Sequence, residues 1–271
     1  MKISVVIPCY LYSSNSIKWL KECIDSFSVS TIFPYEIILV IDGRLCPDKN
    51  LDFLFNKQFL VKIVLSTTRN FSAVSRQIAS DIAFGDIICY QDCDDISHPQ
   101  RLEIINYFFE TKDIVCIHHG GTTVDNKNFN KMNDFKKIED FSKLKTINSD
   151  ELFKAYFKNG KWPPTPGCEH QDLICYAWPF CQAMAGVPAV RKNIFSKIKW
   201  RQSGRIKTDL PDIPLRRMCF SKKYKIEDNP DIKEINEFEI GQDQEFAMEV
   251  LYEFRKSLVI NESLYNYRKW K

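Results

Sequence analysis

Long hydrophobic runs, closely paired cysteines and a large excess of one charge are all missing from this chain of 271 residues. No stretch approaches the roughly 20 apolar residues that a membrane-spanning helix needs. The apolar run at residues 3–7 is too short for the core of a signal peptide, so we expect neither a membrane span nor a signal peptide. The net charge of +3 is small for this length, and composition therefore predicts no nucleic-acid partner.

The ten cysteines form no Cys-x-x-Cys pair, and several fall inside expected strands or helices. This scatter favours reduced, packed thiols in a reducing compartment, and we expect a cytoplasmic protein. Zinc-ligand residue types do cluster at Cys168, His170, Cys175 and Cys181. Their spacing matches no structural zinc pattern, so we do not expect a zinc site there.

Strand and helix patterns alternate over the first 110 residues. Four apolar runs predict buried strands, at 3–8, 36–41, 61–66 and 87–90. Helical spacing of apolar residues separates them, at 17–27, at 70–83 and after Pro99, with cap residues at 13–16 for the first helix. The alternation predicts an α/β fold with a mainly parallel central sheet flanked by helices.

The rest of the chain is less regular, with its strongest internal boundary near residue 120. Strands are expected at 113–118, 185–191 and, as a short final strand, 258–260; helices are expected at 150–158, 192–198 and 241–254. Residues 125–180 lose periodicity and include a proline-rich loop at 162–167, which is typical of a functional loop or an insertion.

Three carboxylates follow the strand at 87–90: Asp92, Asp94 and Asp95. Open parallel sheets bind ligands at the carboxyl ends of their strands. Acids this close repel one another, so a divalent cation with oxygen ligands, carrying a phosphate, fits the position. The alternative is that Asp95 or Ser97 caps the next helix and the remaining acids are solvated.

The first half of the chain resembles family 2 glycosyltransferases, which have the A-type glycosyltransferase fold. I-S-V-V-I-P-C-Y at 3–10 resembles their first strand, beside the nucleotide base, and implies donor contacts from Pro8 and Tyr10. E-I-I-L-V-I-D-G at 36–43 resembles the second strand, whose terminal acids contact the base and ribose; only Asp42 is present here. The block 69–102 contains Arg76 and the D-C-D-D acids at the family spacing.

The resemblance extends to the second half through G-Q-D-Q-E-F at 241–246, which is similar to the family's catalytic-base motif. Gln242 stands where glutamate is usual, and Asp243 is retained. The implied organisation is a single Rossmann-like domain over 1–271. Residues 1–120 would bind the nucleotide sugar, and residues 121–271 would bind the acceptor and supply the base. Trp162, Trp178 and Phe180 are candidates for stacking on sugar rings, although burial is the usual role of such aromatics.

The resemblance implies a metal-dependent, inverting transfer of a sugar, with a UDP-linked donor expected and a hydroxyl of a glycan, protein or lipid as acceptor. Asp94 would bind Mn²⁺ or Mg²⁺, and Asp92 would contact the ribose or give a second metal contact. Cys93 belongs to the donor site only as a spacer, because a thiol is a poor ligand for a hard cation. Arg76 would reach the base or phosphates, and Asp243 would deprotonate the acceptor hydroxyl. Glu245 would be a neighbouring polar contact or a simple surface acid.

Several alternatives stay open. Arg76 could be an ordinary surface arginine, and Asp243 could only cap its helix. In the tail Y-N-Y-R-K-W, Trp270 replaces the histidine of a common family pattern, which leaves a third metal ligand unassigned. His118, His119 and His170 could replace it, but a structural role is the simpler interpretation.

Two other functions compete with the transferase. A catalytically inactive relative that binds a sugar nucleotide or glycan would explain Gln242 and Trp270. A nucleotidyltransferase is less favoured, because residues 8–16 contain no glycine-rich, basic phosphate loop.

Overall fold

The computed structural model describes residues 1–43, 51–67, 70–125, 133–153, 188–200 and 242–269. Their strands form one sheet in the order β3-β2-β1-β4-β8-β6-β9-β5, with β7 paired to β9 outside this path. The strands are β1 (Ile3–Cys9), β2 (Glu36–Ile41), β3 (Leu60–Leu65), β4 (Ile87–Tyr90), β5 (Ile96–Ser97), β6 (Cys116–Asp125), β7 (Thr146–Ile147), β8 (Ala189–Arg191) and β9 (Ser257–Lys269). The α-helices are α1 (Ser14–Ser28), α2 (Phe71–Ile82), α3 (Arg101–Thr111), α4 (Ser149–Phe153) and α6 (Gln242–Phe254).

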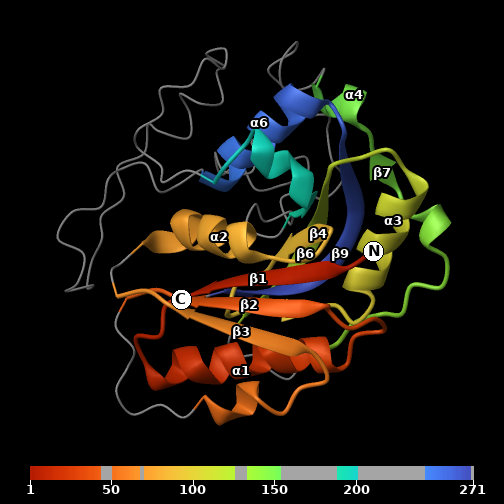
Figure 1. Cartoon of the computed structure of the whole chain (residues 1–271). Helices are drawn as coiled ribbons and strands as arrows, with labels where there is room; N and C mark the ends of the chain where they lie inside the picture. The colour runs from red at the N-terminus through yellow and green to blue at the C-terminus, as the bar shows by residue number, and fades with distance from the viewer. Residues whose placement is uncertain (44–50, 68–69, 126–132, 154–187, 201–241, 270–271) are drawn as a thin grey trace.

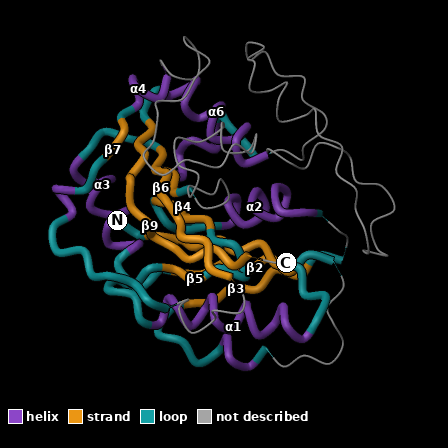
Figure 2. Tube along the Cα trace, turned by 180° about the vertical axis from the view of Figure 1, so that it is seen from behind, coloured by secondary structure: helices purple, strands orange, loops and turns teal. Residues whose placement is uncertain are grey.

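Helices cover both faces of the sheet, and the strands alternate their side chains between the two layers. Val5 and Ile7 of β1 pack with residues of α1 and α3, whereas Val6 packs with residues of α2 and α6. Figure 1 shows α1 and α2 on opposite sides of the sheet, and the reverse view in Figure 2 agrees. Burial on both faces explains the continuous apolar runs in the sequence. The predicted α/β sheet flanked by helices is confirmed.

The strand order places a switch point beside β1. From β1 the chain proceeds through α1 to β2 and then to β3, and after α2 it returns to pair β4 with the other edge of β1. All three of these pairings are parallel. Ligands of open α/β sheets bind where the strand order reverses in this way, at the carboxyl ends of the strands.

The far half of the sheet is mixed, which the sequence did not predict. β8 runs antiparallel between β4 and β6, and β5 and β7 pair antiparallel with β9. β9 was expected to be a short strand at 258–260, but it extends over 13 residues. Asn261 and Glu262 interrupt its apolar pattern, and pairing with β6, through two register shifts near Gly120, keeps the chain extended past them.

Close approach of β6 and β9 depends on glycine. A Cβ added at Gly121 would lie 2.2 Å from the ring of Tyr265, and one at Gly120 would lie 2.8 Å from the carbonyl oxygen of Glu262. No side chain can occupy that space without displacing the backbone of β9 or the ring of Tyr265. The glycines are therefore required for the packing that brings the end of β9 to the acid-rich loop after β4.

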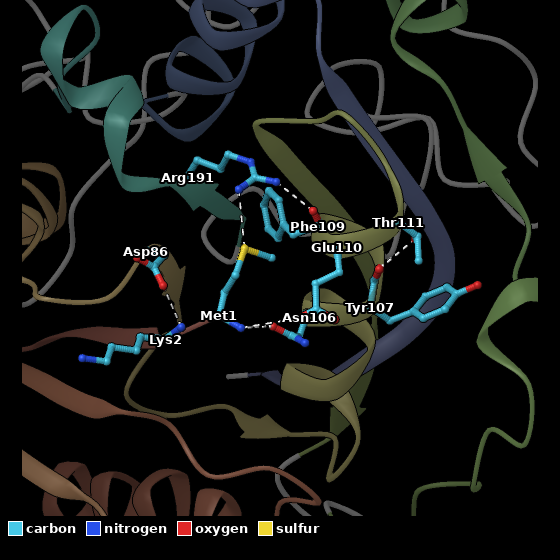
Figure 3. A network of polar contacts seen from close by, with 9 residues as sticks. All are labelled: Met1, Lys2, Asp86, Asn106, Tyr107, Phe109, Glu110, Thr111 and Arg191. Carbon is cyan, nitrogen blue, oxygen red and sulfur yellow. Dashed lines mark hydrogen bonds and ion pairs between the residues drawn. The ribbon is translucent and has the colours of Figure 1, made fainter.

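Polar contacts join the elements at the opposite end of the sheet, where β1 begins (Figure 3). The amino group of Met1 bonds Asn106 Oδ1 of α3 at 3.0 Å, and the Lys2 amide donates to Asp86 Oδ2 at 2.9 Å. Arg191 of β8 donates to the carbonyl of Phe109 at 2.7 Å. These contacts fix strand ends that are remote from the switch point, so we assign them to stability.

The cap of α1 and the length of the helices can also be compared with the sequence predictions. Ser13 and Ser16 form a capping box at the start of α1, as the polar residues at 13–16 predicted. Within the described ranges, no helix combines the length and apolar character needed to cross a membrane. Parts of the expected helix 150–158 and strand 185–191 lie outside the described residues.

Candidate active site

A cavity of about 190 Å³ lies at the switch point between β1 and β4; we call it the switch-point cavity. Six residues that the sequence assigned to donor or metal binding line it: Pro8, Tyr10, Asp42, Asp92, Cys93 and Asp94. They come from the ends of β1 and β2 and from the loop after β4. The topology therefore gathers, at one place, residues separated by up to 86 positions in the chain.

Arg76 joins this cavity to α6. Its guanidinium donates to Asp92 Oδ1 at 2.9 Å and to Asp243 Oδ1 at 2.5 Å. Arg76 is buried, so its interpretation as a surface arginine is wrong. Asp243 is the second residue of α6, and its carboxylate accepts a hydrogen bond from Arg76. One cation therefore connects the acid-rich loop to the residue predicted to be the base.

Burial and charge determine the protonation of Arg76 and Asp243, which lie beside Asp92. Burial raises the pKa of Asp243 and the Asp92 carboxylate raises it further, whereas Arg76 opposes both; the net shift is upward. Burial disfavours the charged form of Arg76, but attraction to Asp243 and Asp92 raises its pKa above the ordinary value. Arg76 therefore stays charged, and Asp243 is a stronger base than a solvated aspartate.

Asp42 positions the start of α2. Its two carboxylate oxygens accept hydrogen bonds from the amides of Asn70, at 2.5 Å, and Phe71, at 2.7 Å. Phe71 has a φ of 61°, a strained conformation for a side chain of this size, and the bonds to Asp42 hold it there. Through α2, this arrangement also helps to place Arg76.

Arg268 of β9 holds the loop that carries the acids. Its amide donates to Asp95 Oδ1 at 3.0 Å, its Nε donates to the carbonyl oxygen of Asp94 at 2.9 Å, and its Nη2 bonds Glu22 Oε2 at 2.8 Å. Asp95 is fully buried, and burial, with Asp94 and Asp92, raises its pKa. Neither Asp95 nor Ser97 caps α3: that helix starts after Gln100 without a side-chain cap, and Ser97 lies in β5, so the capping alternative is wrong.

The acid loop offers a suitable but incomplete set of metal ligands. Asp92 and Asp94 present carboxylate oxygens, which hard divalent cations prefer. Within the described part of the chain, no three His, Cys, Asp or Glu side chains converge on one metal position. This fits a cation held by one or two carboxylates together with substrate phosphates, the usual arrangement for Mg²⁺. Ser75 Oγ, buried beside the cavity, also has no partner among the described atoms, as expected for a group that binds a ligand.

Sequence reasoning missed Arg101 and Arg268. Arg101 is fully buried and donates to Gln91 Oε1 at 2.7 Å, to the Tyr90 carbonyl at 2.7 Å and to His119 Nε2 at 2.9 Å. Arg101 belongs to P-Q-R-L at the end of the block 69–102, and Arg268 belongs to the tail Y-N-Y-R-K-W; these motifs were the signal available. Their contacts fix the end of β4 and the acid loop.

His118 and His119 are structural, as the simpler interpretation held. His118 Nε2 lies 3.1 Å from Cys116 Sγ, and His119 bonds Arg101 and the Gly120 carbonyl. Burial lowers the pKa of His118 to about 3 and that of His119 well below its ordinary value. Other predicted residues lie outside the described ones: Trp270, His170 with its three neighbouring cysteines, the 162–167 loop, Trp162, Trp178, Phe180, and the side chains of Gln242 and Glu245.

A second cavity, of about 430 Å³, lies beside β6 and β9. Thr123, Asn266 and Phe135 are among the residues that line it. It contains none of the residues predicted for donor, metal or catalysis. Despite its larger volume, we assign the site to the switch-point cavity, because the buried ion pairs and the acid loop meet there.

Comparison with known proteins agrees with this arrangement. The family model described as glycosyl transferase family 2 matches residues 4–163. A glycosyltransferase of Nostoc sp. is 28% identical over 180 residues, covering 64% of this chain and 52% of that protein. One from Rickettsia felis is 26% identical over 126 residues, 46% of this chain and 20% of that protein, so the chain spans only a fraction of its relatives.

Solved structures show the same fold. S. aureus TarS 1–349 in complex with UDP-GlcNAc superimposes with a TM-score of 0.58 at 15% identity, over 100% of this chain and 59% of that one. The predicted A-type fold is thereby confirmed. The matched model covers more than half of the sequence, including β1, the acid loop and Arg76. This chain belongs to glycosyl transferase family 2.

Proposed function

We propose that this chain is a metal-dependent, inverting glycosyltransferase that moves a sugar from a UDP-sugar to a hydroxyl of a glycan, protein or lipid. The observation that supports the proposal is the bridge from Asp92 through Arg76 to Asp243, which places the candidate base and the acid loop in one site. Family membership supports the transferase class, and the TarS complex with UDP-GlcNAc supports a UDP-linked donor.

The donor would bind in the switch-point cavity. Pro8 and Tyr10, at the end of β1, would flank the base, and Asp42 would face the base and ribose from the end of β2. Asp94 and Asp92 would hold Mn²⁺ or Mg²⁺, which when bound stabilises the negative charge of the departing diphosphate. Arg76 would orient Asp92 and add positive charge beside the phosphates.

Asp243 would act as the base. Its Oδ1 is bonded to Arg76, so Oδ2 is the atom that would receive the acceptor's proton. Its raised pKa improves its match to a hydroxyl proton at neutral pH. A single base without a nucleophilic carboxylate implies direct displacement, which inverts the anomeric carbon. In this scheme residues 1–120 bind the donor, and residues 121–271 bind the acceptor and supply the base.

The test is release of nucleoside diphosphate from UDP-, GDP- and TDP-sugars with Mn²⁺, Mg²⁺ or EDTA. We expect slow hydrolysis of one UDP-sugar that requires metal and is lost in Asp94→Ala. Asp243→Asn should bind that donor yet release no UDP. Asp81→Asn is the matched control, because Asp81 is an exposed aspartate of α2. Release that persists in EDTA would contradict the metal dependence.

A catalytically inactive binding protein is a second candidate, favoured by one observation. Gln242 stands where the family's glutamate is usual, and Trp270 stands where its histidine is usual. Such a protein would bind a UDP-sugar in calorimetry, and neither wild type nor Asp243→Asn would release UDP with any acceptor offered.

A further inference from the structure

Two cysteines from distant parts of the chain meet in the switch-point cavity. Cys9 is the last residue of β1, and Cys93 stands between Asp92 and Asp94 in the acid loop. Both residues line this one cavity of about 190 Å³. Neither sulfur has a role in the proposed transfer reaction.

Strand register explains why they meet. β1 and β4 pair in parallel, with Val5 opposite Cys89 and Val6 opposite Tyr90, and the Gln91 amide continues the ladder to the Val6 carbonyl at 3.0 Å. β1 ends at Cys9, and the turn that follows β4 carries Cys93 three residues beyond Tyr90, so both lie at the same edge of the sheet. Disulfides join Cα atoms separated by roughly 4.4–6.8 Å. A disulfide between these residues therefore holds the acid loop within that distance of the end of β1.

We propose that Cys9 and Cys93 form a reversible disulfide that displaces the acid loop and closes the switch-point cavity to its ligand. With a peroxide as oxidant, the Cys9 sulfur attacks one peroxide oxygen, the O–O bond breaks, and a sulfenic acid and water form. The Cys93 sulfur then attacks the sulfenic sulfur, and the S–S bond forms as hydroxide leaves. The two thiol protons end in the two waters, and the sulfur pair loses the two electrons that the peroxide gains.

The bond would disturb the residues that surround it. An S–S bond of about 2.05 Å is shorter than any non-bonded approach of two sulfur atoms, so the loop must move toward β1. Asp92 and Asp94 flank Cys93 directly, and Asp92 is held by Arg76 on the other side. Movement of the loop would pull Asp92 from Arg76 and reposition Asp94. That the ligand is a nucleotide sugar rests on the proposed function.

A third thiol, Cys23 of α1, is close by and is the natural competitor. Its Sγ donates to the Asp92 carbonyl at 3.4 Å, but it is fully buried and does not line the cavity. Cys23 is therefore the control residue for the pairing of Cys9 with Cys93.

The experiment treats the full chain with hydrogen peroxide, blocks free thiols and maps the linked peptides by mass spectrometry. UDP-sugar binding is measured by calorimetry before oxidation, after it, and after reduction with dithiothreitol. We expect a Cys9–Cys93 link and a fall in donor affinity of at least about tenfold that reduction reverses. Cys9→Ser should lose the effect of oxidation, and Cys23→Ser should retain it, each compared with its own reduced form.

Hydrogen exchange of residues 91–95 gives a readout that needs no nucleotide, and oxidation should accelerate it. If the reduced protein binds no nucleotide sugar, the proposed function fails, and the mapped link with this exchange still decides the disulfide. A link from Cys93 to Cys23, no link at all, or a Cys9–Cys93 link that changes neither donor binding nor exchange would overturn the inference.

Discussion

Replacing Arg76 with methionine should move the pH dependence of catalysis to higher pH. Arg76 is the one residue that we find bonded to both Asp92 and Asp243, at 2.9 and 2.5 Å, within the described structure. Methionine has similar length but no charge. Its substitution leaves two carboxylates facing each other without the cation between them, so protonation of Asp243 becomes easier.

The size of the effect follows from the geometry. Two unit charges about 4 Å apart attract by about 4 kcal/mol at an effective dielectric constant of about 20, equivalent to about 3 pKa units. The Asp243 side chain is 22% exposed, and solvent screens part of this attraction. We therefore expect the pKa of Asp243, already raised, to rise by a further amount of about 1–2 units. Since the base must be ionised, activity appears only above its pKa.

The assay is kcat/KM for UDP release as a function of pH. The acid limb should move up by about 1–2 pH units in Arg76→Met and by less than about half a unit in Arg76→Lys, which keeps the charge. If Arg76→Met is too slow to assay, the carboxyl carbon resonance of Asp243, assigned with Asp243→Asn, reports the same pKa. An acid limb and a resonance that do not move would refute the electrostatic role of Arg76.

Three further predictions concern single residues. Ser75→Ala should weaken UDP-sugar binding by about 1 kcal/mol while thermal stability is unchanged, because the hydroxyl has no partner among the described atoms; equal binding would contradict this. Burial lowers the pKa of His118 to about 3, so the unfolded chain binds a proton at this residue more readily than the folded chain does. The contribution of neutral His118 to the free energy of unfolding is therefore full above about pH 6.5, and the free energy of unfolding should fall by about 2 kcal/mol between pH 7 and 5. Urea titrations of His118→Gln should show a smaller fall, and an equal one would exclude His118 as the cause. Arg268→Gln should raise the KM for the donor about tenfold and accelerate exchange in residues 91–95, with partial recovery in Arg268→Lys; unchanged KM would contradict its role in holding the acid loop.

Local patterns in the sequence were sufficient for the donor half of the fold. Strands buried on both faces are continuous apolar runs, and acids that follow such runs fall at the edge where ligands bind. That logic predicts Asp42, Asp92 and Asp94 at the carboxyl ends of their strands, and the three residues line one cavity.

The local residue patterns do not predict contacts between segments that are far apart in the sequence. Arg76 and Asp243 are 167 positions apart, and only the family motifs suggested that both belong to one site. β9 was underestimated because Asn261 and Glu262 break its apolar pattern, and so the role of Arg268 at its end was missed. The meeting of Cys9 and Cys93 depends on the β1–β4 register, which residue patterns do not encode.

The most direct test of the central claim compares wild type with Asp243→Asn on one UDP-sugar, with Mn²⁺ and with EDTA, measuring UDP binding and UDP release together. We predict that both proteins bind UDP with metal, and that only wild type releases UDP from the donor. Equal release by both proteins would contradict Asp243 as the base. Failure of both to bind UDP would contradict the assignment of the switch-point cavity as the donor site.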